Sequence, residues 1–292
     1  MPRSRRFIQL DVFSNKPLLG NPLAVVVDSD GLDDATMQAF ARWTNLSETT
    51  FLLPPTSAAA DYRVRIFTPR QELPFAGHPS VGSAYAAIES GLVPTGKTSL
   101  VQECAAGLLS VHVIGDGPSR IIHVQAPPAQ LTQMDGELRA CLGTALHVEL
   151  SHEQVCHVDN GPHWILCDLH EGASVRSLQP DMGAIARLCE QQDAVGVCVF
   201  GREHEEDAAM AVRAFCPADG IPEDPVTGSA NAAIMAWLAR RERNDYGLSY
   251  RASQGREVGR DGYVEVALDQ ASGAITIGGA CVIGVRGELH IA

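Results

Sequence analysis

Apolar and polar side chains alternate along several short segments of the chain, and this alternation predicts β-strands. The period of two is clearest in FIQLDVF (7–13) and in DYRVRIFTP (61–69), because successive side chains of a strand point to opposite faces of a sheet. LAVVVD (23–28) is continuously apolar, which is typical of a strand buried on both faces. Similar patterns predict a hairpin of strands at 108–115 and 120–128, and further strands at 49–55, 163–169, 194–201, 208–217, 263–268, 274–279 and 287–292.

Fewer segments have the spacing of a helix. DDATMQAFARW (33–43) has acidic residues in its first turn, and HPSVGSAYAAIESG (78–91) has a proline near its start and a glycine at its end, which are favourable positions for those residue types. The other predicted helices are residues 181–191 and the alanine-rich segment 229–241. Strands in runs with a few helices between them favour an α+β fold over a regular doubly wound α/β sheet.

Two parts of the chain can be aligned with each other, which indicates an internal duplication. Residues 65–69 (RIFTP) match residues 213–217 (RAFCP), and after a loop residues 72–78 (ELPFAGH) match residues 223–229 (EDPVTGS). In each half a strand is followed by a loop that contains proline, a glycine and a helix. The repeat predicts two similar domains with a cleft between them, although stretches rich in glycine and alanine can also resemble each other by chance.

The start of each repeated helix is suited to bind an anion. The first N–H groups of a helix lack partners within it and lie at the positive end of its dipole, and glycine lets a ligand come close to the main chain. Gly77 and His78 begin one helix, and Gly228 and Ser229 begin the other. Two such starts facing one cleft would hold a carboxylate through main-chain groups, so we expect a small substrate that carries a carboxylate.

Composition and charge exclude other classes of partner and location. The net charge of −13 argues against a nucleic-acid partner, which would require a basic face, and no apolar run is long enough to span a membrane. The eight cysteines are scattered and form no C-x-x-C pair, and the N-terminal segment lacks the apolar stretch of a signal peptide. We therefore expect reduced thiols in a cytoplasmic protein.

Motifs for a nucleotide cofactor or a metal are absent from the sequence. The spacing of Gly77, Gly82 and Ser83 resembles a P-loop, but the lysine that would contact the phosphate is missing. No G-x-G-x-x-G motif follows a predicted strand. The histidines between residues 147 and 170 match no compact set of metal ligands. We expect neither a cofactor nor a bound metal.

Three side chains near these helices could carry chemistry. Glu48 lies where a turn enters an apolar strand, and a carboxyl group against apolar walls has a raised pKa that suits it to both give and take a proton. The spacing Asn45-x-x-Glu48 also has the form of a capping box, so a structural role is the alternative. Asp224 and His78 adjoin the two helix starts, and each could contact a ligand or serve as a turn or cap residue.

Four long stretches closely resemble the signature segments of the phenazine-biosynthesis isomerase family, the PhzF-like proteins. Their order and spacing match those of the family across nearly the whole chain. The four stretches are LDVFSNKPLLGNPLAVVVD (10–28), NLSETTFLL (45–53), FTPRQELPFAGHPSVGSAY (67–85) and GIPEDPVTGSANAA (220–233).

The resemblance implies a fold and a domain division. The fold would be the diaminopimelate-epimerase-like α+β fold, with two pseudo-symmetric domains, each a sheet curled around a central helix, and the active site in the cleft between them. Residues 1–129 with a C-terminal strand at about 283–292 would form the first domain, and residues 130–282 the second. The resemblance also implies a homodimer.

The resemblance assigns roles to individual residues as well. Racemases and epimerases of the wider superfamily pair two cysteines, each directly before the glycine that opens a helix, and the matching residues here are Ala76 and Thr227. A two-thiol mechanism is therefore excluded. The catalytic glutamate of the family matches Glu48, and His78 and Asp224 match residues that contact polar substituents of the substrate.

The remaining assignments concern substrate binding. The backbone at Gly77, Gly228 and Ser229 would hold the substrate carboxylate, and the loop that contains Asn160 and His163 resembles a substrate-facing loop of the superfamily. The sequence is thus interpreted as a cofactor-independent isomerase that moves a proton within a small carboxylic acid, such as a dihydro-hydroxyanthranilate. An amino-acid racemase or epimerase with Asp224 as second proton carrier, and a non-catalytic carboxylate-binding protein, are the alternatives.

Overall fold

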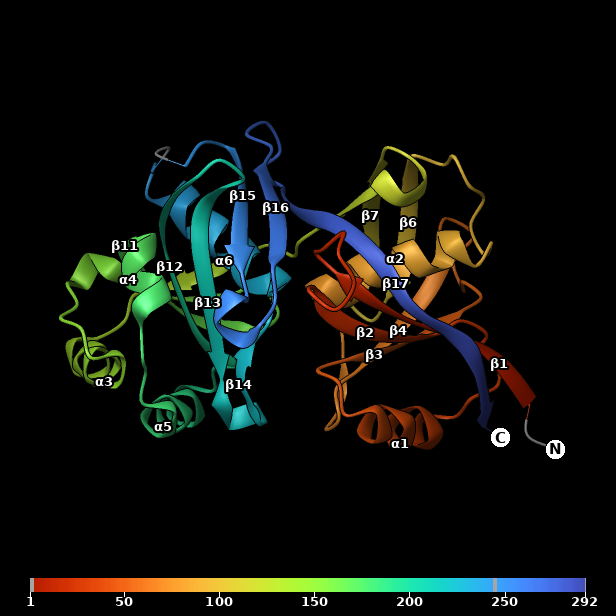
Figure 1. Cartoon of the computed structure of the whole chain (residues 1–292), viewed down its shortest axis with the longest axis horizontal. Helices are drawn as coiled ribbons and strands as arrows, with labels where there is room; N and C mark the ends of the chain where they lie inside the picture. The colour runs from red at the N-terminus through yellow and green to blue at the C-terminus, as the bar shows by residue number, and fades with distance from the viewer. Residues whose placement is uncertain (1–2, 244–245, 292) are drawn as a thin grey trace. The chain divides into compact units, whose positions relative to one another are not determined.

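The computed structural model describes residues 3–243 and 246–291 (Figure 1). The chain divides into two compact units: Met1–Gln125 with Gly278–Ala292, called the first unit, and Ala126–Ile277, called the second unit. These divisions fall at 125/126 and 277/278, whereas the divisions predicted from the sequence are at 129/130 and 282/283. Ala292, the last residue of the predicted C-terminal strand, lies outside the described residues.

The strands of the first unit pair in a closed ring. Their bounds are β1 Arg3–Val12, β2 Asn21–Val26, β3 Thr49–Leu53, β4 Tyr62–Phe67, β5 Glu72–Leu73, β6 Ser99–Cys104, β7 Gly107–Ile114, β8 Ile121–Gln125 and β17 Ile275–Ile291. The order of pairing is β1–β2–β3–β4–β6–β7–β8–β17, and β17 pairs again with β1. The short strand β5 pairs with β4. The sheet therefore curls into a barrel, as the sequence analysis predicts.

Helix α2 (Gly77–Glu89) is the central helix of this barrel, and its residues from Gly77 to Ile88 are all buried. Its small side chains allow this burial. A Cβ atom added at Gly82 would lie 2.6 Å from Cδ2 of Leu23 and 2.7 Å from Cγ2 of Val12, so glycine lets the helix pack directly against β1 and β2. The helix begins and ends close to the predicted positions.

Helix α1 (Asp34–Thr44) packs outside the barrel. Asp33 caps its start by accepting a hydrogen bond from the main-chain N–H of Thr36 at 2.7 Å, which is the common role of aspartate at this position. Met37 and Phe40 bury the apolar side of the helix against a cluster that includes Phe51 of β3. The helix fixes the direction in which the chain enters β3.

The second unit repeats this arrangement. Its strands are β9 Gln130–Thr132, β10 Val155–Asp159, β11 His163–Glu171, β12 Gly196–Glu205, β13 Ala208–Cys216, β14 Ile221–Asp224, β15 Ser249–Gln254 and β16 Gly262–Leu268. Its helices are α3 Gly136–Leu146, α4 Gly172–Ser177, α5 Met182–Gln192 and α6 Gly228–Arg240. Short 3₁₀ turns are η1 Gly117–Ser119 in the first unit, and η2 His152–Gln154, η3 Pro217–Asp219 and η4 Arg256–Val258 in the second. The buried helix α6 lies behind β13, β15 and β16 in Figure 1.

The pairing of strands confirms the duplication seen in the sequence. In the first unit β2 and β3 are parallel, β3 and β4 antiparallel, β4 and β6 parallel, and β6 and β7 antiparallel. In the second unit the same alternation runs through β11, β12, β13, β15 and β16. The two-strand ladder of β4 with β5 corresponds to that of β13 with β14. The two units are therefore pseudo-symmetric.

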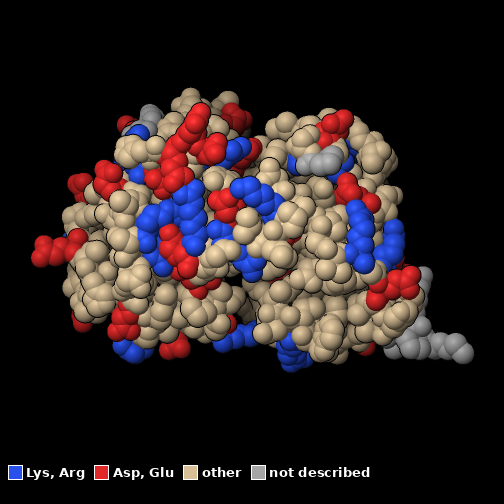
Figure 2. Space-filling model, in the orientation of Figure 1, with Lys and Arg blue, Asp and Glu red and all other residues tan. Residues whose placement is uncertain are grey.

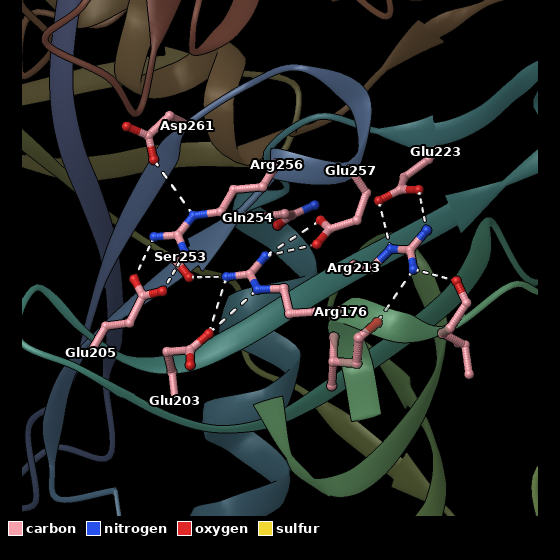
Figure 3. Close-up of polar contacts among 12 residues, drawn as sticks. Arg176, Glu203, Glu205, Arg213, Glu223, Ser253, Gln254, Arg256, Glu257 and Asp261 are labelled. Atoms are coloured by element: carbon pink, nitrogen blue, oxygen red, sulfur yellow. Dashed lines mark hydrogen bonds and ion pairs between the residues drawn. The ribbon is translucent and has the colours of Figure 1, made fainter. Parts of the chain in front are cut away.

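An arginine–glutamate pair marks the same place in both halves of the repeat. In the first unit Nε and Nη2 of Arg65 donate to the two carboxylate oxygens of Glu72 at 2.7 and 2.6 Å. In the second unit Nε and Nη2 of Arg213 donate to those of Glu223 at 3.0 and 2.8 Å (Figure 3). Each pair joins the last long strand before the buried helix to the short strand that follows it. The two aligned sequence segments thus form the same local structure, once in each unit.

The viewed face of the second unit carries charges of both signs. Figure 2 shows Lys and Arg side chains beside Asp and Glu side chains over the region of β12 and β13. In Figure 3 Arg176 contacts Glu203 and Glu257, and Arg256 contacts Glu205. Opposite charges are thus paired on this part of the face. Apolar side chains of the same two strands, among them Val197 and Phe215, pack in a cluster with residues of α3 and α5.

Two predicted strands near the C-terminus form a single strand in the structure. The segments 274–279 and 287–292 were expected to be separate strands, but β17 runs without interruption from Ile275 to Ile291. Its glycines do not break it, because neighbouring strands pair with it along its length. A Cβ atom at Gly278 would lie 1.7 Å from Cδ2 of His123 in β8, so this glycine is needed for the close approach of the two strands. Within the described residues, no helix has both the length and the apolar character needed to cross a membrane.

Candidate functional site

Glu48 lies at the point where the chain passes from α1 into β3. Asn45 ends α1 with a left-handed conformation (φ 54°), and its N–H donates to the carbonyl oxygen of Ala41, which is a common way to end a helix. The capping-box interpretation of Asn45 and Glu48 is therefore wrong, because Asn45 closes a helix and does not open one. β3 is buried along its whole length, so Glu48 is held against the apolar interior with a side chain only 16% exposed.

His78 is the second residue of α2, and its side chain is 6% exposed. The N-cap of the helix is Ala76, which makes no side-chain bond, so His78 does not cap the helix. Instead its ring faces Glu48: Nε2 of His78 lies 3.4 Å from Oε2 of Glu48. The residue before β3 and the second residue of α2 thus bring a carboxylate and an imidazole together in a largely buried place. A proton can be held there or passed between them.

Asn21 is a third member of this group and was not predicted from the sequence. It is the first residue of β2 and is fully buried, and its Nδ2 lies 3.4 Å from Nδ1 of His78. When this amide donates to Nδ1, the neutral ring carries its proton on Nε2, the atom that faces Glu48. The signal in the sequence is a polar residue between Gly20 and Pro22, directly before an apolar run.

Asp224 ends β14 in the second unit and is largely buried. Its Oδ2 accepts a hydrogen bond of 2.6 Å from the hydroxyl of Thr227, and its main-chain oxygen accepts one of 3.0 Å from Nε2 of Gln254. The N-cap of α6 is Thr227, and it makes no side-chain cap bond. Asp224 is therefore not the capping residue of α6, and its carboxylate is held beside the start of that helix.

Asn160 and Ser229, both predicted from the sequence, lie together at the start of α6. Nδ2 of Asn160 donates to the main-chain oxygen of Ser229 at 2.9 Å. The hydroxyl of Ser229 accepts a hydrogen bond of 3.2 Å from Nε1 of Trp164. Gly228 is the first residue of α6, as Gly77 is of α2. Each predicted glycine thus begins its helix, and Asn160 fixes the first turn of α6 from a neighbouring strand end.

His163 makes different contacts. Its Nε2 lies 3.1 Å from Nδ1 of His157, and its Nδ1 lies 3.2 Å from the main-chain oxygen of Asp193. Burial and the neighbouring His163 lower the pKa of His157, so this ring is neutral at physiological pH. The contacts that the structure shows for His163 do not include Asn160 or Ser229, and its role in binding stays a prediction.

The cysteines do not take the place of the missing catalytic thiols. All eight are free, and the two positions before the helix glycines are Ala76 and Thr227. Burial raises the pKa of Cys156 to about 11 and that of Cys189 to about 12. Cys216 is close to Asp224, and burial together with that negative charge raises its pKa well above the ordinary value. These groups are protonated thiols at neutral pH and poor nucleophiles or bases.

Each unit brings some of the predicted residues together. In the first unit Glu48 and His78 are in contact, next to Gly77. In the second unit Asp224 and Ser229 flank the start of α6, which begins at Gly228. Among the residues that the structure describes, no group of three or more His, Cys, Asp or Glu side chains is placed to hold a metal ion. The chemistry that these groups can offer is proton transfer and the binding of a polar, anionic compound.

Comparison with known proteins identifies the family. A phenazine biosynthesis-like protein family, PhzC-PhzF, matches residues 10–287. A Schizosaccharomyces pombe protein named antisense-enhancing sequence 1 is 36% identical, with 98% of each chain covered. The trans-2,3-dihydro-3-hydroxyanthranilate isomerase of Pseudomonas aeruginosa is 34% identical, with 87% of each chain covered. The crystal structure of a Bacillus anthracis phenazine biosynthesis protein of the PhzF family superposes with a TM-score of 0.84 at 28% identity, covering 99% of this chain and 100% of the other.

These similarities extend over both units, and the similar structures also include racemase and epimerase folds. The diaminopimelate-epimerase-like α+β fold predicted from the sequence is confirmed. The starts of the two buried helices, with their opening glycines Gly77 and Gly228, belong to the same stretches that carry the resemblance. The chain belongs to the phenazine biosynthesis-like PhzC-PhzF family.

Proposed function

We propose that this chain is a cofactor-independent isomerase that moves a proton between two carbon atoms of a small carboxylic acid. The observation that carries the proposal is the contact between Glu48 and His78, a carboxylate and an imidazole held in a largely buried place. The isomerase names of relatives such as the Pseudomonas aeruginosa protein support the class of reaction. The absence of thiols at positions 76 and 227 supports a carboxylate as the group that transfers the proton.

In this proposal Glu48 acts first as a base and then as an acid. Its carboxylate takes a proton from one carbon of the substrate, and the electron pair that is released spreads into the neighbouring double bond and carboxylate. Glu48 then returns the proton to another carbon, and a different double bond remains. Substrate and product are isomers, so no oxidant, reductant or second substrate is consumed. General acid–base catalysis of this kind contributes about 10²–10⁴-fold to a rate.

Substrate binding is assigned to the helix starts and the side chains near them. The N–H groups at the starts of α2 and α6 suit the substrate carboxylate, and His78 and Asp224 suit polar substituents on the same molecule. The homodimer implied by the family resemblance is retained here as a proposal and is separate from this chemistry.

The named substrate of the Pseudomonas aeruginosa relative is the first compound to test. The protein is incubated with trans-2,3-dihydro-3-hydroxyanthranilate in deuterated buffer, and the carbon-bound hydrogens are followed by NMR. We expect a product with a shifted double bond and deuterium at the carbon that receives the proton. A compound that is returned with deuterium and inverted configuration at the carbon beside the carboxylate would favour the epimerase alternative. Binding without any exchange would favour the non-catalytic alternative.

A further inference from the structure

A chain of hydrogen bonds between buried side chains joins β15 to the start of α6. Gln254, the last residue of β15, is fully buried. Its Nε2 donates to the main-chain oxygen of Asp224 at 3.0 Å and to Oγ1 of Thr227 at 2.8 Å. Its Oε1 accepts from the main-chain N–H of Thr227 at 3.0 Å and from Nδ2 of Asn231 at 3.4 Å. Both ends of the amide are thus engaged inside the second unit.

The position of Gln254 on its strand separates it from the charged outer face. Ser253, the residue before it, hydrogen-bonds Arg176 in the network of arginines and acidic residues, whereas Gln254 lies beside this network in Figure 3 without a bond to it. Successive residues of a strand point to opposite faces. The side chain of Gln254 is therefore directed to the interior and to α6.

The main chain fixes the orientation of the Gln254 amide. A carbonyl oxygen can only accept a hydrogen bond, and a main-chain N–H can only donate one. Nε2 must therefore face the oxygen of Asp224, and Oε1 must face the N–H of Thr227. The reverse orientation would place two acceptors together at one end and two donors together at the other, which is costly for buried groups.

The direction of the Thr227 hydroxyl follows from this orientation. Its oxygen accepts a hydrogen bond from Nε2 of Gln254, and its own hydrogen is then directed to Oδ2 of Asp224 at 2.6 Å. A donor at this distance favours the ionised form of a carboxyl group. We propose that Gln254 is a positioning residue that fixes the Thr227 hydroxyl as a donor and so holds Asp224 as an ionised acceptor beside α6.

Other charged and titratable groups surround Asp224. Cys216 of β13 is an uncharged thiol, because burial and the charges of Asp224 and Asp219 raise its pKa. Glu223 precedes Asp224 on β14 and is paired with Arg213 of β13. Asp219 on η3 acts on the same Cys216 thiol. The hydrogen bond that Thr227 donates favours the ionised form of Asp224.

An ionised Asp224 has a defined use in the proposed reaction. It would accept a hydrogen bond from an N–H or O–H substituent of the substrate, and it would not deliver a proton to carbon. An epimerase that used Asp224 as its second proton carrier would need the protonated form in part of its cycle. The assignment of a substrate contact rests on the proposed function, whereas the direction of the Thr227 hydroxyl does not.

The test follows the Asp224 carboxyl carbon by ¹³C NMR as pH is varied, with the ligand-free protein. The signal is assigned by its loss in Asp224→Asn. We expect the midpoint of its titration to move to higher pH in Thr227→Val, which keeps the side-chain volume but removes the donor. Gln254→Met should move it in the same direction by a smaller amount, because the hydroxyl can then turn away. Thr227→Ser, which restores the hydroxyl, should return the midpoint to that of the wild type.

Gln102 supplies the matched control. It is a fully buried glutamine on β6 in the first unit, where it donates to Ser80, so Gln102→Met should leave the Asp224 midpoint unchanged. An unchanged midpoint in Thr227→Val would overturn the donor role of the hydroxyl, and this result counts even if Gln254→Met does not fold. An unchanged midpoint in a folded Gln254→Met, with a shift in Thr227→Val, would overturn the positioning role of Gln254. The titration of Asp224 needs no substrate. Its outcome is therefore independent of whether the protein catalyses the proposed isomerisation.

Discussion

Nε2 of His78 lies 3.4 Å from Oε2 of Glu48, although one residue opens a helix and the other enters a strand. The contact depends on α2 being the central helix of the first unit and on β3 passing beside its start. Asn21 lies on the other side of the ring. The first unit therefore holds an imidazole between a carboxylate and an amide.

Replacing His78 should impair turnover more than stability. In His78→Gln the imidazole beside Glu48 is lost, and we expect kcat/KM for proton exchange to fall by about 100-fold. His112→Gln, on the exposed side of β7 in the same unit, is the control and should behave as the wild type. The measurement is the rate of proton exchange in deuterated buffer, followed by NMR for the wild type and both variants. A wild-type rate in His78→Gln would remove the ring from the proposed mechanism.

The two arginine–glutamate pairs of the repeat should differ in their effect on stability. The Arg213 and Glu223 side chains are each 5% exposed, whereas Arg65 and Glu72 are 22% and 35% exposed. Arg213→Met leaves a buried carboxylate without its partner, which costs about 3–5 kcal/mol. Arg65→Met should cost about 1 kcal/mol or less, as is typical of exposed pairs.

Urea unfolding of the two methionine variants measures this difference directly. We expect the free energy of unfolding to be highest in the wild type, lower in Arg65→Met and lowest in Arg213→Met. Equal losses in the two variants would show that burial does not decide the contribution of the pair.

The packing of α2 against the barrel should not tolerate an added methyl group at Gly82. The new Cβ atom would lie within 2.7 Å of side-chain carbons of Leu23 and Val12, and such overpacking costs about 1–3 kcal/mol. At Gly287 of β17 an added Cβ meets no atom within 4 Å. Gly287→Ala should therefore be close to neutral. Thermal unfolding of the two alanine variants compares them, and a neutral Gly82→Ala would contradict the close packing.

The buried thiols predict a loss of stability at alkaline pH. Burial raises the pKa of Cys156 from 9.0 to about 11 and that of Cys189 from 9.0 to about 12. When the pH rises above the ordinary thiol pKa of 9.0, the unfolded chain releases these protons while the folded chain keeps them. The folded state then binds more protons, so the free energy of unfolding falls as pH rises.

Urea unfolding at about pH 8 and about pH 10 tests this linkage. The fall between the two conditions should be smaller in the double variant Cys156→Ala and Cys189→Ala than in the wild type. The same fall in both proteins would mean that these thiols do not contribute.

Much of the fold could be predicted from the sequence, because the buried strands are apolar and the two segments of the internal repeat can be aligned with each other. The strands and helices at 23–28, 33–43 and 61–69 follow from local pattern alone. β15 was not predicted, because its sequence SYRASQ places polar side chains on both faces. Its inward polar residue, Gln254, has its partners at the start of α6, and no local pattern shows that pairing.

The candidate site was predictable in part for the same reason. Glu48 and His78 stand out through their local context, but their contact with each other depends on how β3 and α2 pack. Asn21 meets His78 only because β2 passes beside the start of α2. Thr227 was noted as a replacement for a thiol, whereas its hydrogen bond to Asp224 is visible only in three dimensions.

The central claim is that Glu48 carries the proton, and its removal tests that claim most directly. Glu48→Gln keeps the size of the side chain but cannot exchange a proton. Glu103→Gln, which alters a carboxylate that accepts a hydrogen bond from the main chain of Thr56, is the matched control. The measurement is the single-turnover rate of isomerisation of trans-2,3-dihydro-3-hydroxyanthranilate. We predict a fall of about 10²–10⁴-fold in Glu48→Gln and a wild-type rate in Glu103→Gln, whereas a wild-type rate in Glu48→Gln would contradict the account.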